Sequence, residues 1–168
     1  MAQKKMLAPN ETIWFVPIAA IADVNVGPTQ ANMASDAVNL SCSIVTGYTL
    51  GMTDSDTDDS KSICDAGNAV NYTSGVYEGN LTFFREDNLA DSAGVFAQSF
   101  SLLKQPAEGI WVKRIGKPAT TAYATTDVVS WFHFDSDYTQ DSDDGDAPKQ
   151  FTVPLIPQGH FGVNVVLS

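Results

Sequence analysis

Cysteine and histidine are scarce in this 168-residue chain, which contains two of each. Cys42 and Cys64 are too few for a disulfide-stapled scaffold and lack the spacing of a metal site, so we expect two reduced, small apolar side chains. His133 and His160 belong to no protease, redox or nucleophile motif, and the sequence has no glycine-rich phosphate loop. These absences favour a protein that is not an enzyme and uses no cofactor.

Long apolar runs are also missing. No run approaches the roughly 18–20 residues needed to span a bilayer. The first residues, with Lys4 and Lys5 followed by Pro9, lack the apolar stretch of a secretory signal. We therefore expect neither a membrane partner nor secretion by that route. Hydrophobic residues nevertheless make up 43% of the chain, which is enough for a packed core and excludes wholesale disorder.

Basic residues are few: nine Lys and Arg stand against twenty Asp and Glu, for a formal net charge of −11. A basic nucleic-acid reader is disfavoured, because neutralising phosphates requires clustered Lys and Arg. The acid is concentrated in two windows. Residues 54–65 contain five Asp and one Lys, and residues 135–146 contain six Asp and no base. We interpret the windows as two solvated acidic loops on a nearly neutral body.

Calcium binding is an alternative for both windows, since this ion prefers carboxylate oxygens at alternate positions. Asp54, Asp56 and Asp58 match the first, third and fifth positions of an EF-hand loop. The sixth position, however, holds Asp59 where the sharp turn requires Gly, and the sequence does not indicate the paired flanking helices. The solvated loop is the favoured interpretation.

A continuous apolar run occupies residues 12–21. Such a run is typical of a strand that is buried on both faces or covered by a neighbouring subunit. Pro17 cannot donate to a ladder, which predicts an edge strand or a bulge. An apolar edge without charged side chains favours pairing with another chain. Trp14, Phe15 and Val16 are therefore candidate self-assembly residues.

Strand patterns also dominate the rest of the sequence. Residues 75–86 alternate well, with Tyr77, Leu81 and Phe83 predicted on one face. Pro154 predicts that its strand lies at an edge or ends early. Further strands are predicted over residues 38–45, 47–52, 110–115, 127–134, 150–156 and 160–167.

One helix is predicted, over residues 88–104. Apolar residues recur there on a single stripe, Asn88 is a suitable N-cap, and Pro106 ends the helix. The stripe indicates packing against a sheet. Because no repeat or linker divides the chain, the sequence predicts a single domain over residues 1–168. Its fold class is mainly β, a sandwich or barrel of about seven or eight strands with one flanking α-helix.

Three stretches carry a resemblance to a known family. They are LAPNETIWFVP at residues 7–17, LSCSIVTGYTLGMTDSDTDDSKSICDAGN at residues 40–68 and YEGNLTFFRE at residues 77–86. The chain resembles the major tail (tail tube) proteins of long-tailed, siphovirus-type phages of actinobacteria. This resemblance implies a structural virion protein, assembled in the host cytoplasm, whose hexameric rings stack into a hollow tube that conducts DNA to the host. Besides the chain itself, it implies tape-measure, tail-tip and terminator proteins as partners.

In that family a long loop bridges adjacent rings, and residues 49–70 correspond to it. Residues 135–146 remain an acidic loop of unassigned role. We expect Lys113, Arg114 and Lys117, the only basic cluster, to meet an acidic arm across an interface. DNA in transit is expected to slide past a like-charged lumen without specific binding. The acidic candidates for self-assembly are Asp54, Asp56, Asp58 and Asp59.

Two alternative functions remain open. The tube of a contractile injection system follows the same ring logic, and the sequence barely separates it from a long flexible tail. A non-catalytic β-sandwich adhesin or carbohydrate-binding module is the second alternative. Such a module requires exposed aromatic side chains, whereas Trp14, Trp111 and Trp131 all lie in apolar strands, where core roles are favoured.

Overall fold

A computed structural model of the chain describes residues 10–58, 71–88, 90, 92–142 and 148–168. Its main feature is one antiparallel sheet formed by β1 (Glu11–Pro17), β2 (Val38–Asn39), β3 (Thr49–Met52), β6 (Tyr77–Phe84), β7 (Glu108–Ile115), β8 (Val128–Ser136), β9 (Gln140–Ser142) and β10 (Gln150–Val166). The strand order is β2-β1-β7-β8-β10-β6-β3, and β9 pairs with β10 beside this path. The prediction of a mainly β fold with seven or eight strands is confirmed.

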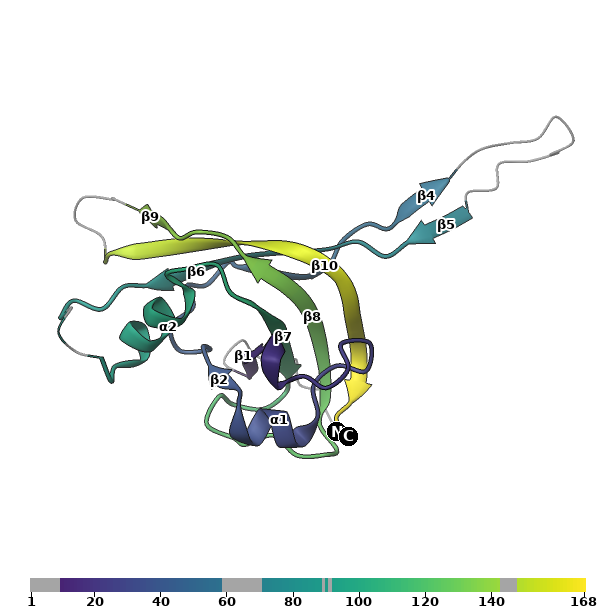
Figure 1. The fold of residues 1–168 in the computed structure, drawn as a ribbon, viewed down its shortest axis with the longest axis horizontal. Helices are drawn as coiled ribbons and strands as arrows, with labels where there is room; N and C mark the ends of the chain where they lie inside the picture. The colour runs from purple at the N-terminus through teal and green to yellow at the C-terminus, as the bar shows by residue number, and fades with distance from the viewer. Residues whose placement is uncertain (1–9, 59–70, 89, 91, 143–147) are drawn as a thin grey trace, which may run out of the picture.

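The sheet is strongly curved, and the segment after β2 joins its two ends (Figure 1). The Leu40 N–H donates to the Ile13 carbonyl on β1, and the Val45 N–H donates to the Thr82 carbonyl on β6. Because β1 and β6 lie near opposite ends of the strand order, these bonds close the sheet into a barrel-like shape. The fold is therefore one curled sheet with a closing segment.

Two hydrophobic cores lie on opposite faces of β1, β7 and β8. Phe15 and Trp111 belong to the first core, together with Leu81 and Phe83 of β6. The residues next to them in sequence, such as Val16, belong to the second core, which packs against η1 (Ile18–Ala20) and α1 (Gln30–Ser35). Successive side chains of a strand point to opposite faces. This double burial explains the continuous apolar run at residues 12–21 and confirms that β1 is buried on both faces.

The long helix is shorter than the sequence predicts. Helix α2 spans Val95–Leu103 with Gly94 as its N-cap. Asn88 does not cap it, because the Asn88 side-chain oxygen accepts the Ala90 N–H at 3.1 Å and forms a local turn instead. From α2, Leu103 enters the first core, so the predicted packing against the sheet is confirmed. Within the described residues, neither α1 nor α2 is long and apolar enough to cross a membrane.

Residues 150–166 form one strand where the sequence predicts two. Strand β10 pairs with β6 over its first half and with β8 over its second, with shifts in register between Pro157 and Phe161. The expected edge position of Pro154 is wrong. Its carbonyl accepts the Asp137 N–H just beyond the end of β8. Since the N–H and C=O of a strand residue face the same neighbour, the N–H that proline lacks would face Asp137, beyond the last residue of β8, so no ladder bond to β8 itself is lost.

A two-stranded ribbon, β4 (Asp56–Asp58) and β5 (Asn71–Ser74), continues from β3 and β6. It projects beyond the curved sheet, away from α2 and β9, which lie at the other end of the molecule (Figure 1). We call residues 53–58 and 71–76 the arm. Residues 59–70 lie outside the described residues.

Candidate self-assembly surfaces

The predicted assembly residues of β1 lie inside the subunit. Phe15 and Val16 are 1% and 0% exposed, and Trp14 is half-buried with its ring edge-on to Tyr123. Strand β7 pairs along the whole of β1, and β2 pairs with it at residues 14 and 15. The Ile13 N–H donates to the Ser41 hydroxyl at 2.9 Å. The expectation that β1 is an open edge is therefore wrong, because residues 38–41 cover it.

The residues of the predicted basic cluster also form their contacts within the subunit. Arg114 is 1% exposed, and its guanidinium donates to the Asp127 carboxylate at 2.8 Å and to the carbonyls of Thr121 and Ala122. Lys117 forms a second ion pair with Asp127. The cluster thus fastens the connection between β7 and β8, and Arg114 is not positioned to meet an acidic arm from another subunit.

The charge state of Asp127 follows from these contacts. Burial alone raises the pKa of its carboxyl, but hydrogen bonds from Lys117 and Arg114 outweigh burial and hold the pKa below its usual value. Lys113 also forms an ion pair, since its ammonium lies 2.7 Å from the Glu11 carboxylate. Each member of the predicted basic cluster therefore has an acidic partner within its own chain.

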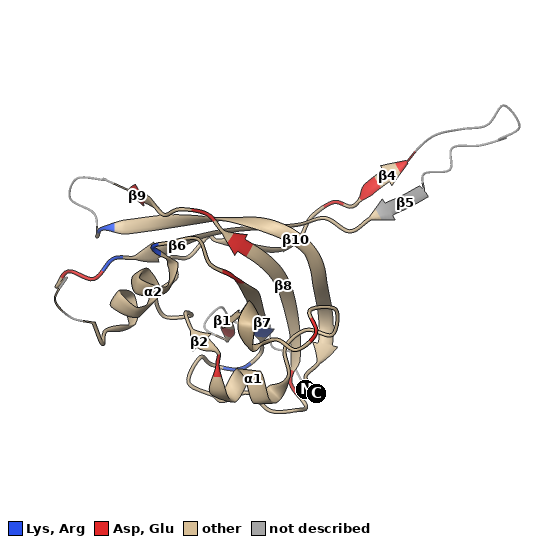
Figure 2. Cartoon of the chain, viewed as in Figure 1, with Lys and Arg blue, Asp and Glu red and all other residues tan. Residues whose placement is uncertain are grey.

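The acidic candidates lie on the arm, where Asp54, Asp56 and Asp58 are exposed. The concentration of acid on β4 is visible in Figure 2. The Ser74 hydroxyl donates to the Asp56 carboxylate at 3.2 Å, across the ribbon. Asp59, the fourth acidic candidate, lies outside the described residues. The first acidic window thus begins on a projecting ribbon, where the sequence predicts only a loop.

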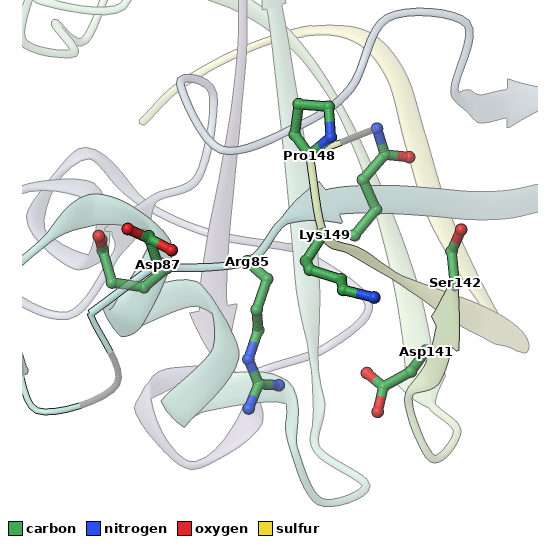
Figure 3. A pocket seen from close by; sticks show the side chains of 8 residues that line it. Arg85, Asp87, Asp141, Ser142, Pro148 and Lys149 are labelled. Carbon is green, nitrogen blue, oxygen red and sulfur yellow. The ribbon is translucent and has the colours of Figure 1, made fainter. Parts of the chain in front are cut away.

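A groove of about 730 Å³ lies at the opposite end of the molecule, where β6 ends beside the β9–β10 hairpin. Figure 3 shows side chains of both signs in it. Its charged lining comes from Arg85, Glu86, Asp87, Asp141 and Lys149. Because acids and bases are mixed and none of the described lining residues is a histidine or cysteine, the groove resembles neither an anion site nor a nucleophilic active site.

Two open strand edges, which sequence reasoning missed, are the best candidates for pairing with another copy. Strand β6 pairs with β10 only from Gln150 to Leu155, so among the described residues no strand pairs with this side of β10 from Ile156 to Val166. Strand β3, at the end of the strand order, pairs with β6 and with no other described strand. The first of these edges carries exposed apolar side chains, namely Val163 at 42%, Val165 at 37% and Val166 at 61%.

A polar face free of basic residues lies on the side of β3, β6 and β10 that faces away from the first core. Asn80 is exposed there, with Thr49 beside it on β3 and Pro154 beside it on β10. The hydroxyls of Thr82 and Thr152 form a hydrogen bond of 2.9 Å on the same face. No Lys or Arg occurs in β3, in β6 or in residues 150–156. Apart from Glu78, this face is uncharged, and Pro154 and Ile156 add apolar side chains to its Thr, Asn and Gln side chains.

The tryptophans offer no platform for a sugar. Trp111 and Trp131 are 0% and 3% exposed, which confirms their core roles. The described residues therefore do not support a carbohydrate-binding module built on exposed indole rings.

Comparison with models of protein families gives a match over the whole chain. A family model described as "Phage tail tube protein" matches residues 1–168. Among curated proteins, none matches the chain. Proteins of this family are structural components of the virion tail, which associate with themselves and with other tail components. Because the match spans every residue, the chain belongs to the phage tail tube protein family.

Proposed function

We propose that six copies of this protein form a ring, and that the rings stack into the hollow tail tube through which phage DNA reaches the host. The observation that carries the proposal is the pair of open edges on one subunit. Pairing the β10 edge of one copy with the β3 edge of the next is a head-to-tail contact, and such contacts close into a ring where the rotation fits. The pairing covers exposed valines and unpaired backbone groups.

The polar face of β3, β6 and β10 suits the wall of the lumen. Lys and Arg bind phosphates, so a wall that lacks them lets DNA slide. This face offers Thr, Asn and Gln side chains in place of the strongly acidic lumen that the net charge suggests. The Asp residues are instead concentrated in residues 54–65, which begin on the arm (Figure 2), and in residues 135–146.

The arm suits the contact between rings, since it projects from one end of the subunit. Its carboxylates repel those of other copies most strongly at low salt, because the screening length is about 30 Å at 0.01 M ionic strength and about 10 Å at 0.1 M. This repulsion favours free subunits until a tail-tip or initiator complex presents a matching surface. The resemblance to tail proteins of actinobacterial phages supports a long flexible tail, with tape-measure and terminator proteins as partners, over a contractile system.

Negative-stain electron microscopy of the purified protein, with and without tail-tip complex, tests the proposal. The wild type should form rings or tubes with a central channel. The double variant Val163→Lys, Val165→Lys places charge on the β10 edge and should stop assembly while the subunit stays folded. Ile115→Lys is the control, because Ile115 is an apolar residue that is also exposed, at 58%, and lies on β7, away from that edge. Assembly by the double variant, or a wild type that stays monomeric even on added tips, would contradict the proposal.

A further inference from the structure

Three side chains that can each ligate a metal ion lie close together where β7 begins and β8 ends. Glu108 on β7 lies opposite Asp135 on β8, and Ile110 lies opposite His133. Residues two apart on a strand share a face, so Glu108, His133 and Asp135 point to the same side of the sheet. One ligand atom from each of the three lies within 4.8 Å of the other two. We call these three residues the Glu-His-Asp cluster.

The hydrogen bonds of the cluster are incomplete. His133 is 6% exposed, and its Nε2 lies 3.1 Å from the Glu108 carboxylate. Its Nδ1 atom is buried without a hydrogen-bond partner, and so is Oδ1 of Asp135. Buried polar atoms nearly always have a partner, because leaving one unsatisfied costs about 1–3 kcal/mol. These two unpartnered atoms, on two metal-ligating residues of one cluster, are available to a ligand.

We propose that the Glu-His-Asp cluster binds a divalent first-row transition-metal ion, of which zinc is the probe. Imidazole nitrogen and carboxylate oxygen together suit such ions, whereas calcium takes oxygen ligands. Three ligand atoms in a tetrahedral arrangement about 2.0–2.2 Å from one ion lie about 3.3–3.6 Å from one another. The three atoms of the cluster lie within 4.8 Å of one another, so the side chains must move together by up to about 1.5 Å to hold an ion. This site is distinct from the calcium alternative on residues 54–65.

The surroundings of the cluster also favour a cation. The His160 ring, on β10, lies 5.8 Å from the His133 ring and provides a further donor nearby. Asp135 lies opposite Ile156, at the point where β10 leaves β6. A bound ion would therefore link the first residue of β7 to the end of β8, beside the bend of β10. The proposal does not depend on the tube function.

Titration of the chelator-treated, full-length protein with zinc, in competition with a chromophoric chelator, tests the site. We expect the wild type to bind one zinc ion per subunit. Glu108→Gln and Asp135→Asn should each lower the zinc affinity at least about tenfold. Glu108→Gln is the variant less prone to disturb folding, because the Glu108 side chain is 50% exposed and a glutamine amide there can still hydrogen-bond to His133. Asp141→Asn removes the same charge from β9, outside the cluster, and should leave zinc affinity unchanged.

Cobalt gives a second readout that does not depend on stability, because the intensity of its visible absorption bands reports the coordination number. Circular dichroism confirms that each variant is folded. Absence of stoichiometric zinc binding would overturn the proposal and leave a plain His133–Glu108 hydrogen bond. So would zinc binding that survives both variants, or calcium binding of equal strength, since each places the ion elsewhere.

Discussion

The hydroxyl of Tyr77 on β6 accepts the N–H of Gly159 in β10 at 2.7 Å, at the point where β10 bends. The same hydroxyl accepts the Gln158 N–H at 3.0 Å and donates to the His133 carbonyl on β8 at 2.9 Å. Gly159 has φ of +85°, a left-handed conformation that favours glycine. One side chain thus joins three strands and sets the direction in which the open half of β10 leaves the sheet.

Removal of the Tyr77 hydroxyl should therefore loosen this bend. We expect Tyr77→Phe to lower the free energy of unfolding by about 1–3 kcal/mol, because it removes a hydrogen bond to the buried His133 carbonyl and two to partly buried N–H groups. Hydrogen exchange at the Gln158 and Gly159 amides should speed up more than at Val153. Tyr138→Phe is the control, since Tyr138 is 61% exposed. Unchanged exchange at the two amides would show that the hydroxyl does not hold the bend.

The Arg114–Asp127 ion pair should contribute to folding of the subunit. Breaking a buried pair by removing one partner costs about 3–5 kcal/mol, so Asp127→Asn should destabilise the monomer by an amount of that order. Urea unfolding followed by circular dichroism measures this. Charge reversal at Arg114 should likewise destabilise the subunit. Any loss of tube assembly in that variant should then follow from unfolding and not from a lost contact between subunits. A folded, stable Arg114→Glu monomer that cannot assemble would restore the role at an interface.

The same pair predicts a dependence of stability on pH. The pKa of Asp127 is lowered in the folded state, so its contribution is fully present above its unfolded pKa of about 3.9 and is lost as pH falls through the folded value. The difference in unfolding free energy between the wild type and Asp127→Asn should be constant above about pH 5 and shrink below about pH 4. Urea titrations at pH 7 and pH 3 measure it, and a difference independent of pH would contradict the assignment.

Two glycines in strands form a matched pair for packing. A Cβ added at Gly109 would lie 2.5 Å from the Phe15 ring, whereas one added at Gly51 has nothing within 4 Å. We expect Gly109→Ala to destabilise the subunit by about 1–3 kcal/mol through overpacking. Gly51→Ala should be neutral, or stabilising by up to about 1 kcal/mol. Equal thermal unfolding temperatures for the two variants would show that β1 and β7 are packed less closely than described.

The lumen assignment predicts an effect of added positive charge at Asn80. Tubes of Asn80→Lys should retain short duplex DNA that wild-type tubes release, and the retention should fall steeply with salt, because released counterions drive phosphate binding. Asn80→Asp is the matched control and should retain none. A filter-retention assay across salt concentrations measures the effect. If Asn80→Lys tubes release DNA like the wild type, a different face lines the channel.

The sequence by itself determined the mainly β fold class and the family. Alternation in residues 77–84 places Tyr77, Leu81 and Phe83 on the buried face, as the pattern predicts. Helix α2 is found, although it begins at Val95 and not at residue 88, because a side-chain turn at Asn88 competes with the helix for backbone hydrogen bonds. These features depend on local periodicity, which a sequence displays directly.

Only the tertiary structure decided which strands lie at edges and which charges are paired. Apolar character marks β1 as a buried strand, but whether β2, β7 or another chain covers it depends on strand order, which periodicity does not encode. Arg114 and Asp127 are 13 residues apart and meet because the β7–β8 connection folds back. The open edge of β10, the polar face around Asn80 and the Glu-His-Asp cluster likewise arise from register between strands. Register is fixed by packing of the whole sheet, and no short stretch of sequence carries it.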